Sequence, residues 1–472
     1  MGRIVPHIMN LTGASTLHYG RGVNLLPKVC VIGAGASGIA AVKALRERGF
    51  EIDCYEKSDV VGGNWVWGNS NGMSSSYRSL HINTSRERME YSDFPMPKSF
   101  PDFPHHTHIA RYFNDYVDHF GVRDNIRFQT GVARAAPAPG GGWEITTERG
   151  DAHFYDALVV ANGHHWDKRL PEPAFPGAET FRGVQMHSHD YTGEDPDFFR
   201  DKTVVVLGMG NSAMDIAVEA SFSAAYTFLA ARRGAHILPK YLFGRPTDQL
   251  GGSPRIPFEV RRKMFEAMLK VYSGDMERYG LPKPDHRFGD AHPTVSDDIL
   301  SRVAHGEVIP KPNIARLDGE QVVFVDGSSV RADVVVYCTG YKVTFPFFDP
   351  ALISAPDNDL PLFRRVFHPS NGGLFFVGLL QPLGAVMPLA EAQSTWICDH
   401  LAGRYVLPDP QAMRADMEKE RRRMFARYVA SKRHTMQVDF DDYLVALRKE
   451  RARGARRAAA QRRPASVGAV AA

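Results

Sequence analysis

The chain is poor in features that mark several large classes of protein. It has four cysteines among 472 residues and no Cys-x-x-Cys pair, so neither a structural zinc site nor a dithiol redox centre is indicated. No apolar run approaches the roughly 20 residues of a membrane-spanning helix, and the N-terminal residues lack the apolar segment of a signal peptide. Isolated thiols are typical of a reducing compartment, so we expect a cytoplasmic protein.

Signatures of several chemistries are missing as well. No nucleophile triad or pair of catalytic carboxylates stands out, and no segment resembles a nucleic-acid-binding module. The histidine pairs His105-His106 and His164-His165 have no cysteine or acidic partners at ligand spacing, so packing or solvated histidines are predicted and no metal site is expected. A net charge of +4, with 43% hydrophobic and 23% charged residues, is ordinary for a globular protein.

A glycine-rich motif follows the first predicted strand. Residues 29–32 are apolar, and a helical pattern to residue 48 and a second strand, 52–55, come after the motif. Such a turn presents backbone N–H groups and the positive end of a helix to a pyrophosphate. Glu56 lies 23 residues after Gly33, where an acid binds a ribose hydroxyl. The pattern predicts an FAD site made by Glu56 and the sequence Gly33-Ala34-Gly35-Ala36-Ser37-Gly38.

A second motif of the same kind begins 175 residues later. The apolar strand 203–207 runs into Gly208-Met209-Gly210-Asn211-Ser212-Ala213, where alanine takes the place of the third glycine. The next predicted strand, 224–231, ends in Arg232-Arg233 and not in an acid. An acid would repel a 2′-phosphate, whereas a guanidinium binds it in bidentate fashion. The second site is therefore predicted to hold NADPH, with Arg232 at the 2′-phosphate.

Two similar apolar strands predict how the domains are arranged. The segment 156–163 and the segment 333–341 each read as a buried strand that closes one dinucleotide-binding domain. We therefore expect an α/β protein with two Rossmann-like domains, the NADPH-binding domain (171–335) being inserted into the FAD-binding domain (28–170 and 336–447). A flexible extension, 1–27, is expected before them.

The C-terminal residues are expected to form a basic flexible tail, 448–472. Between residues 448 and 463 there are seven arginines and Lys449 against Glu450 alone, and no durable apolar stripe. A frayed, solvated helix end is favoured over an arm that binds nucleic acid or a membrane surface.

Several motifs together resemble the flavin-containing monooxygenases, the single-component enzymes that use FAD and NADPH. The segment 181–191 fits the fingerprint FxGxxxHxxxY, and it ends in Tyr191, whereas the related Baeyer–Villiger enzymes end it in Trp. Thr192 departs from the Lys or Arg that often follows. The resemblance spans 28–443, and its further matches are Gly62-Gly63-Asn64-Trp65, Asn83-Thr84-Ser85, Cys338-Thr339-Gly340-Tyr341 and Glu391-Ala392-Gln393.

The resemblance implies the chemistry and further site residues. NADPH reduces FAD, dioxygen forms a C4a-hydroperoxyflavin, and a soft nucleophile, an amine nitrogen or a sulfide, takes one oxygen atom. Asn83 matches the family's asparagine near the flavin and is the candidate catalytic residue, while His187 is expected to serve structure. Further FAD contacts are expected from Asn64, Trp65, Asn83, Thr84 and Gln393.

Two alternatives remain open from the sequence. One is a Baeyer–Villiger or decarboxylating oxygenase that acts on a carbonyl substrate. The other is an uncoupled NADPH oxidase or redox-sensing flavoprotein without a dedicated substrate. The sequence names neither the substrate nor the oligomeric state, so a homodimer is an open expectation.

Overall fold

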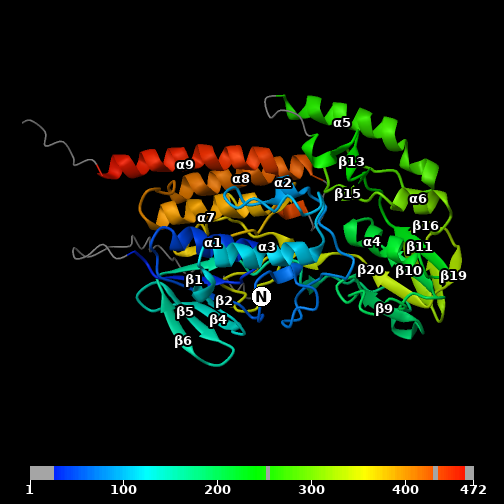
Figure 1. The fold of residues 1–472 in the computed structure, drawn as a ribbon, viewed down its shortest axis with the longest axis horizontal. Helices are drawn as coiled ribbons and strands as arrows, with labels where there is room; N and C mark the ends of the chain where they lie inside the picture. Colours follow the sequence, from blue (N-terminus) through cyan, green and yellow to red (C-terminus); the bar gives the residue numbers. More distant parts are fainter. Residues whose placement is uncertain (1–25, 251–255, 429–433, 463–472) are drawn as a thin grey trace, which may run out of the picture.

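The computed structural model describes residues 26–250, 256–428 and 434–462. Two parallel sheets of five strands each, with helices on one face and an antiparallel meander on the other, form two α/β units that lie side by side (Figure 1). The predicted fold class is confirmed. Apart from residues 26 and 27, the predicted N-terminal extension lies outside the described residues.

The first sheet carries the first glycine motif at the end of its central strand. Its order is β22 (Leu374–Phe376), β7 (Ala157–Val160), β1 (Val29–Ile32), β2 (Ile52–Tyr55) and β3 (Ile126–Arg127). The strands β1, β7 and β22 are continuous apolar runs because both faces of the sheet are covered there. One face packs against α1 (Ala36–Arg46), α3 (His106–His119) and α7 (Met387–Leu401). The other packs against β4 (Val132–Pro137), β5 (Trp143–Thr147) and β6 (Ala152–Tyr155).

The second sheet repeats this plan around the second motif. Its order is β16 (Val308–Pro312), β11 (Tyr226–Ala231), β10 (Thr203–Leu207), β20 (Val334–Tyr337) and β9 (Val184–His187). The helices α4 (Asn211–Ala220) and α6 (Ile299–Ala304) cover one face. The meander of β17 (Ile314–Asp318), β18 (Gln321–Phe324) and β19 (Ser329–Arg331) covers the other. As the sequence repeat predicts, β7 pairs with β1 and β20 pairs with β10.

The chain crosses between the two units twice, and the two crossings pair with each other. β8 (Asp167–Lys168) and β21 (Tyr341–Lys342) form a short antiparallel ladder. After β21 the chain returns to the first sheet as β22. The predicted domain boundary at 335 falls inside β20, which ends at Tyr337, and we propose that the inserted domain extends to the ladder.

A segment inserted after β11 reaches back to the first unit. It contains β12 (Ile237–Leu238), β13 (Tyr241–Leu242), β14 (Arg245–Pro246), α5 (Phe258–Ser273) and β15 (Thr294–Val295). Asp248 Oδ2 accepts a hydrogen bond from the Ser85 backbone N–H at 2.7 Å, just before α2 (Arg86–Met89). The Tyr241 hydroxyl donates to Asp102 at 2.6 Å. The inserted segment therefore braces the loop that carries Asn83.

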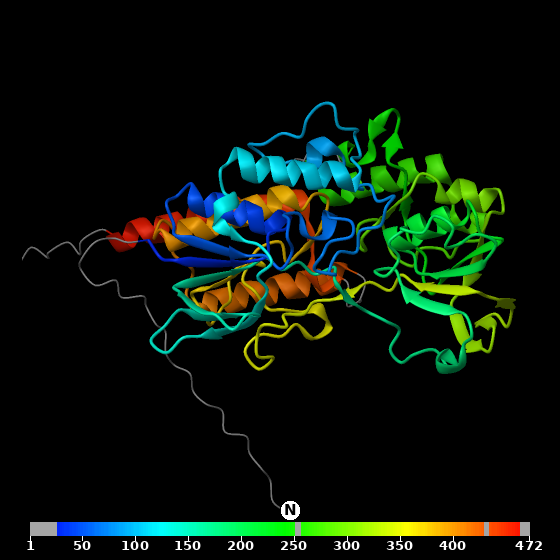
Figure 2. The same ribbon diagram turned by 60° about the horizontal axis from the view of Figure 1, so that its bottom comes forward.

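The C-terminal residues correct the prediction of a flexible tail. Residues 448–462 continue α9 (Phe440–Arg462), which lies along α7 and α8 (Pro410–Arg427) (Figures 1 and 2). Gly454 allows close packing, since a Cβ there would lie 1.9 Å from the Tyr405 ring. The buried Glu450 accepts hydrogen bonds from Tyr405 and Arg457. These contacts fix the basic end of a helix whose buried side begins with Phe440, Tyr443 and Leu447. Residues 463–472 lie outside the described residues.

Candidate active site

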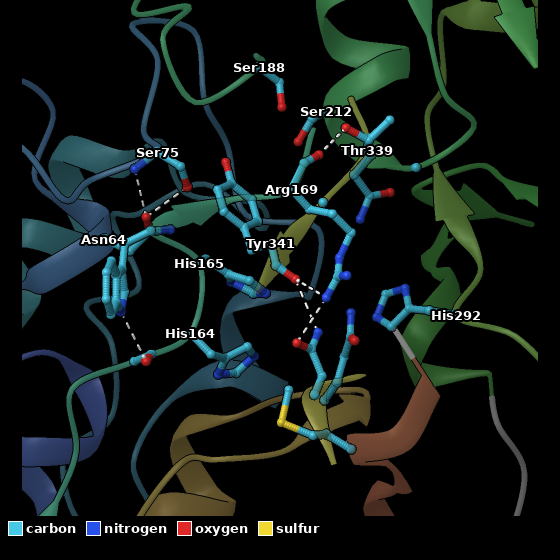
Figure 3. A pocket seen from close by; sticks show the side chains of 18 of the residues that line it. Asn64, Ser75, His164, His165, Arg169, Ser188, Ser212, His292, Thr339 and Tyr341 are labelled. Carbon is cyan, nitrogen blue, oxygen red and sulfur yellow. Dashed lines mark hydrogen bonds between the residues drawn. The ribbon is translucent and has the colours of Figure 1, made fainter. Parts of the chain in front are cut away.

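One continuous cavity of about 1750 Å³ reaches both glycine motifs. Small-molecule sites usually measure about 300–1,000 Å³, so this cavity has room for more than one ligand. Its wall comes from the ends of both sheets, from both chain crossings and from α8 (Figure 3). The two predicted cofactor sites therefore belong to a single space.

The first glycine turn fits the pyrophosphate of a dinucleotide. Gly33 has a φ of +98°, which favours glycine, and a Cβ at Gly38 would lie 1.8 Å from the Gly33 carbonyl oxygen. Gly35, Ala36 and Ser37 line the cavity where α1 begins, so free N–H groups of the helix face it. Gly38 and Ala34 do not line the cavity: Gly38 packs against the turn, and Ala34 is fully buried.

Glu56 closes the other side of the same turn. Its carboxylate accepts hydrogen bonds from the backbone N–H groups of Ala34 and Ser58, both at 2.7 Å, and it lines the cavity. Glu56 is only 5% exposed, so the turn holds the acid in a fixed position. The residues present fit the ribose and pyrophosphate of FAD.

The second turn has the same construction at the far end of the cavity. Gly208 has a φ of +144°, and a Cβ there would lie 2.7 Å from the Cys338 carbonyl oxygen. Gly210 caps α4, and the neighbouring Asn211 Oδ1 accepts a hydrogen bond from Val295 N–H at 2.8 Å. The cavity wall includes Gly208, Gly210, Asn211, Ser212 and Ala213.

The two arginines after β11 differ in their surroundings. Arg232 is exposed, lines the cavity, and makes no ion pair within the described residues. Arg233 also lines the cavity, but its Nε donates to Asp285 at 2.7 Å. Arg232 is therefore the guanidinium that is available to a 2′-phosphate.

Of the five further residues expected to contact FAD, three lie on the wall, Asn64, Trp65 and Asn83. Asn64 Oδ1 accepts hydrogen bonds from Ser75 N–H and Ser75 Oγ, both at 2.8 Å (Figure 3). Trp65 and Asn83 also line the cavity, and Trp65 packs partly on the core of the first unit. The Asn83 amide has no hydrogen-bond partner in the described part of the chain. Thr84 does not line the cavity.

Gln393 lies behind the wall. It is fully buried on α7, where its Oε1 accepts from Gly378 N–H at 2.8 Å and its Nε2 donates to the Tyr443 hydroxyl at 2.7 Å. Gly378 is on the wall, and Gln393 is not. Gln393 therefore shapes the cavity through Gly378.

His187 is placed as a structural residue. Its Nε2 donates to the Gly340 carbonyl oxygen at 3.0 Å, and its Nδ1 accepts from His189 N–H at 3.1 Å. Burial lowers the pKa of His187 to about 4, so its ring is neutral at physiological pH. It does not line the cavity, so no proton transfer to a ligand is assigned to it.

Three residues on the wall were not singled out as site residues by sequence. Tyr341 begins β21, Arg169 comes directly after β8, and His164 lies in the loop after β7 (Figure 3). His164 Nε2 is buried without a hydrogen-bond partner among the described residues, and burial lowers the pKa of His164 to about 4. No sequence spacing joins these residues, because they meet only through the pairing of β8 with β21. In the described ranges no group of three His, Cys, Asp or Glu side chains could hold a metal ion.

Comparisons with known proteins agree on one family. The family model described as flavin-binding monooxygenase-like matches residues 27–452. Flavin-containing monooxygenase 5 of Cavia porcellus is 37% identical over 433 residues, which cover 88% of this chain and 80% of that protein. Dimethylaniline monooxygenase [N-oxide-forming] 2 of Macaca mulatta is 33% identical over 437 residues, with 88% and 81% covered.

Solved structures share the fold. The S-allyl-L-cysteine S-oxygenase of Allium sativum superimposes with a TM-score of 0.68 at 27% identity, over 92% of this chain and 93% of that one. A steroid monooxygenase bound to NADP superimposes with a TM-score of 0.69 at 20% identity, over 91% and 98%. At that identity the second likeness concerns the fold alone.

Proposed function

This chain belongs to the flavin-binding monooxygenase-like family, an oxidoreductase family that works with FAD and NADPH, and we propose that it oxygenates the nitrogen of an amine or the sulfur of a sulfide. The observation that carries the proposal is the single cavity, which extends from the Gly33 turn to the Gly208 turn. Two dinucleotides held by their pyrophosphates at these turns would place the flavin, the nicotinamide and a small substrate in one cavity.

In this proposal the residues of the chain bind and orient the two dinucleotides. Glu56 and the free N–H groups of α1 hold one dinucleotide, while Arg232 and the free N–H groups of α4 hold the other. When bound, FAD accepts hydride from NADPH and activates dioxygen. Asn83, whose amide has no partner within the described residues, donates a hydrogen bond into the cavity without adding charge.

The choice of a soft nucleophile rests on two observations. The fingerprint ends in Tyr191, which the structure buries against Tyr77 and Phe199. Among the relatives, one is named for forming N-oxides and one for S-oxygenation of an amino-acid sulfide. No catalytic triad or metal is needed for this reaction, because the attacking atom of the substrate is itself the nucleophile.

A substrate panel tests the proposal. Holoenzyme is mixed with NADPH and a tertiary amine, a thioether or a ketone, and NADPH oxidation, hydrogen peroxide and product mass are followed together. We expect a product heavier by one oxygen atom from the amine or the thioether, with little peroxide. A lactone or ester from the ketone alone would establish the carbonyl oxygenase instead. NADPH oxidation that yields only peroxide with every compound would establish the uncoupled oxidase.

A further inference from the structure

Arg169 is a cation on the cavity wall without an acidic partner. It follows β8 and is half-buried, and its side chain runs into the cavity, between His165 and His292 in the view of Figure 3. Its Nη2 donates to the Tyr341 carbonyl oxygen at 3.3 Å and to Asn358 Oδ1 at 2.9 Å. Both acceptors are neutral, and Arg169 makes no ion pair in the described part of the chain.

The guanidinium is held in place by a buried amide. Asn358 is 6% exposed, and its Oδ1 also accepts from Val343 N–H at 2.9 Å. Its Nδ2 donates to the Tyr341 carbonyl oxygen at 3.1 Å, and its own carbonyl accepts from Thr435 Oγ1 at 2.8 Å. The position of Arg169 Nη2 is thus fixed, while Nε and Nη1 make no hydrogen bond with described residues.

Three other cations on the same wall are matched by acids, and Arg232, which has no acid partner in the described residues, is the one assigned above to the 2′-phosphate. Arg233 pairs with Asp285 at 2.7 Å, Arg421 pairs with Asp359 at 2.9 Å, and Lys57 pairs with Glu148 at 2.9 Å. A half-buried guanidinium with free N–H donors is suited to bind a carboxylate or a phosphate. The charge-assisted bidentate hydrogen bonds to such a group are the strongest that it makes.

We propose that Arg169 is a specificity residue that binds the carboxylate of the substrate, so that the enzyme selects sulfides or amines that also carry an acid group. This inference rests on the proposed oxygenation of a soft nucleophile. The same positive charge disfavours tertiary amines that are cationic at neutral pH, since like charges in a partly enclosed site repel. A phosphate of NADPH offers the same anionic chemistry, and the experiment separates the two sources.

The test compares an acid with its neutral counterpart. The substrates are 3-(methylthio)propanoate and its methyl ester, and the proteins are the wild-type holoenzyme, Arg169→Gln, Arg169→Lys and the control Arg182→Gln. Arg182 is exposed and lies outside the cavity, so its loss matches the change in net charge. We expect the wild type to prefer the acid by about ten- to a hundredfold in kcat/KM, the gain of a charge-assisted pair. Arg169→Gln should remove this preference by lowering kcat/KM for the acid far more than for the ester. Arg169→Lys should retain part of the preference, and Arg182→Gln should retain all of it.

Equilibrium binding of both compounds to the same holoenzymes, measured by calorimetry, keeps the two proposals separate. If the acid binds preferentially in a way that depends on Arg169 but is not turned over, the carboxylate site is supported. The same result would contradict the proposed oxygenation. Equal use of acid and ester by the wild type would overturn the carboxylate site. So would equal losses with both compounds in Arg169→Gln, which indicate a structural role. A rise in the KM for NADPH alone would assign Arg169 to the nucleotide.

Discussion

The Tyr77 hydroxyl donates a hydrogen bond to the Asp215 carboxylate, and this bond joins the two dinucleotide-binding units. Tyr77 lies in the loop that follows Asn64, and Asp215 lies on α4, five residues after its cap Gly210. Both line the cavity. Burial raises the pKa of Asp215 to about 6, and the bond from Tyr77 opposes that rise.

This raised pKa predicts how stability depends on pH. The folded protein binds the Asp215 proton more tightly than the unfolded chain, whose aspartate has a pKa of 3.8. The contribution to stability is full below about pH 4 and is lost as pH rises through about 6, in total about 3 kcal/mol. We expect the Tm of the wild type to fall relative to that of Asp215→Asn across this window. Parallel Tm curves for the two proteins would contradict the assignment, and Tyr77→Phe should shift the transition to higher pH.

Glu56 is predicted to retain FAD. Glu56→Ala removes the acceptor for the ribose and also for the Ala34 and Ser58 N–H groups, and hydrogen bonds to a charged group contribute about 1.5–3 kcal/mol. We expect FAD to dissociate at least about tenfold more readily. The fluorescence of released FAD measures this, with Glu51→Ala, an exposed acid just before the same strand, β2, as the control. Equal retention in both variants would show that Glu56 does not contact the cofactor.

Arg232 is predicted to select NADPH over NADH. Arg232→Ala should lower kcat/KM for NADPH by about ten- to a hundredfold, because a charge-assisted pair with the 2′-phosphate is lost. NADH should be affected far less. Arg233→Ala is the matched control, since Arg233 is already paired with Asp285. A larger loss of NADPH efficiency in Arg233→Ala than in Arg232→Ala would reverse the two roles.

Asn83 is predicted to couple NADPH oxidation to oxygenation. Asn83→Leu has a similar size but no hydrogen-bonding group, so FAD content should persist because the contacts of the Gly33 turn and Glu56 lie elsewhere. We expect hydrogen peroxide to replace oxygenated product while NADPH is still consumed. The ratio of peroxide to NADPH measures this. A variant that remains fully coupled would make Asn83 a turn residue and no more.

Gly454 is predicted to be required for the packing of α9. Gly454→Val forces a side chain into the Tyr405 ring, and overpacking of this kind costs about 1–3 kcal/mol. We expect a lower Tm, with Ala455→Val, on the exposed side of the same helix, close to the wild type. An equal Tm in the two variants would show that α9 does not pack here.

The local parts of the fold could be predicted because each depends on neighbours in sequence. Gly33 and Gly208 must adopt positive φ after a buried strand, and the segments that became β7 and β20 carry the same apolar pattern. These signals located both sheets and both turns and predicted the two dinucleotide cofactors, while the family resemblance came from the fingerprint at 181–191 and the other short motifs.

The rest depends on contacts between distant segments. Arg169 reaches the cavity only because β8 pairs with β21, and Gln393 stands behind the wall because α7 packs under Gly378. The tail was predicted wrongly for residues 448–462, because the contacts that fix it, from Gly454 and Glu450 to Tyr405, join positions about 45–50 residues apart. The roles of the predicted cofactor residues stay predictions.

The ladder between β8 and β21 has a consequence for how such a chain can be assembled. Because Lys168 and Tyr341 are partners across an antiparallel pair, the two ends of the intervening segment lie about one strand spacing apart, roughly 5 Å. A segment whose ends meet can be exchanged, shortened or excised and its junction resealed by a tight turn, while the strands of the surrounding sheet keep their order. The unit built on the second sheet is thus joined to the rest of the chain by two neighbouring strands.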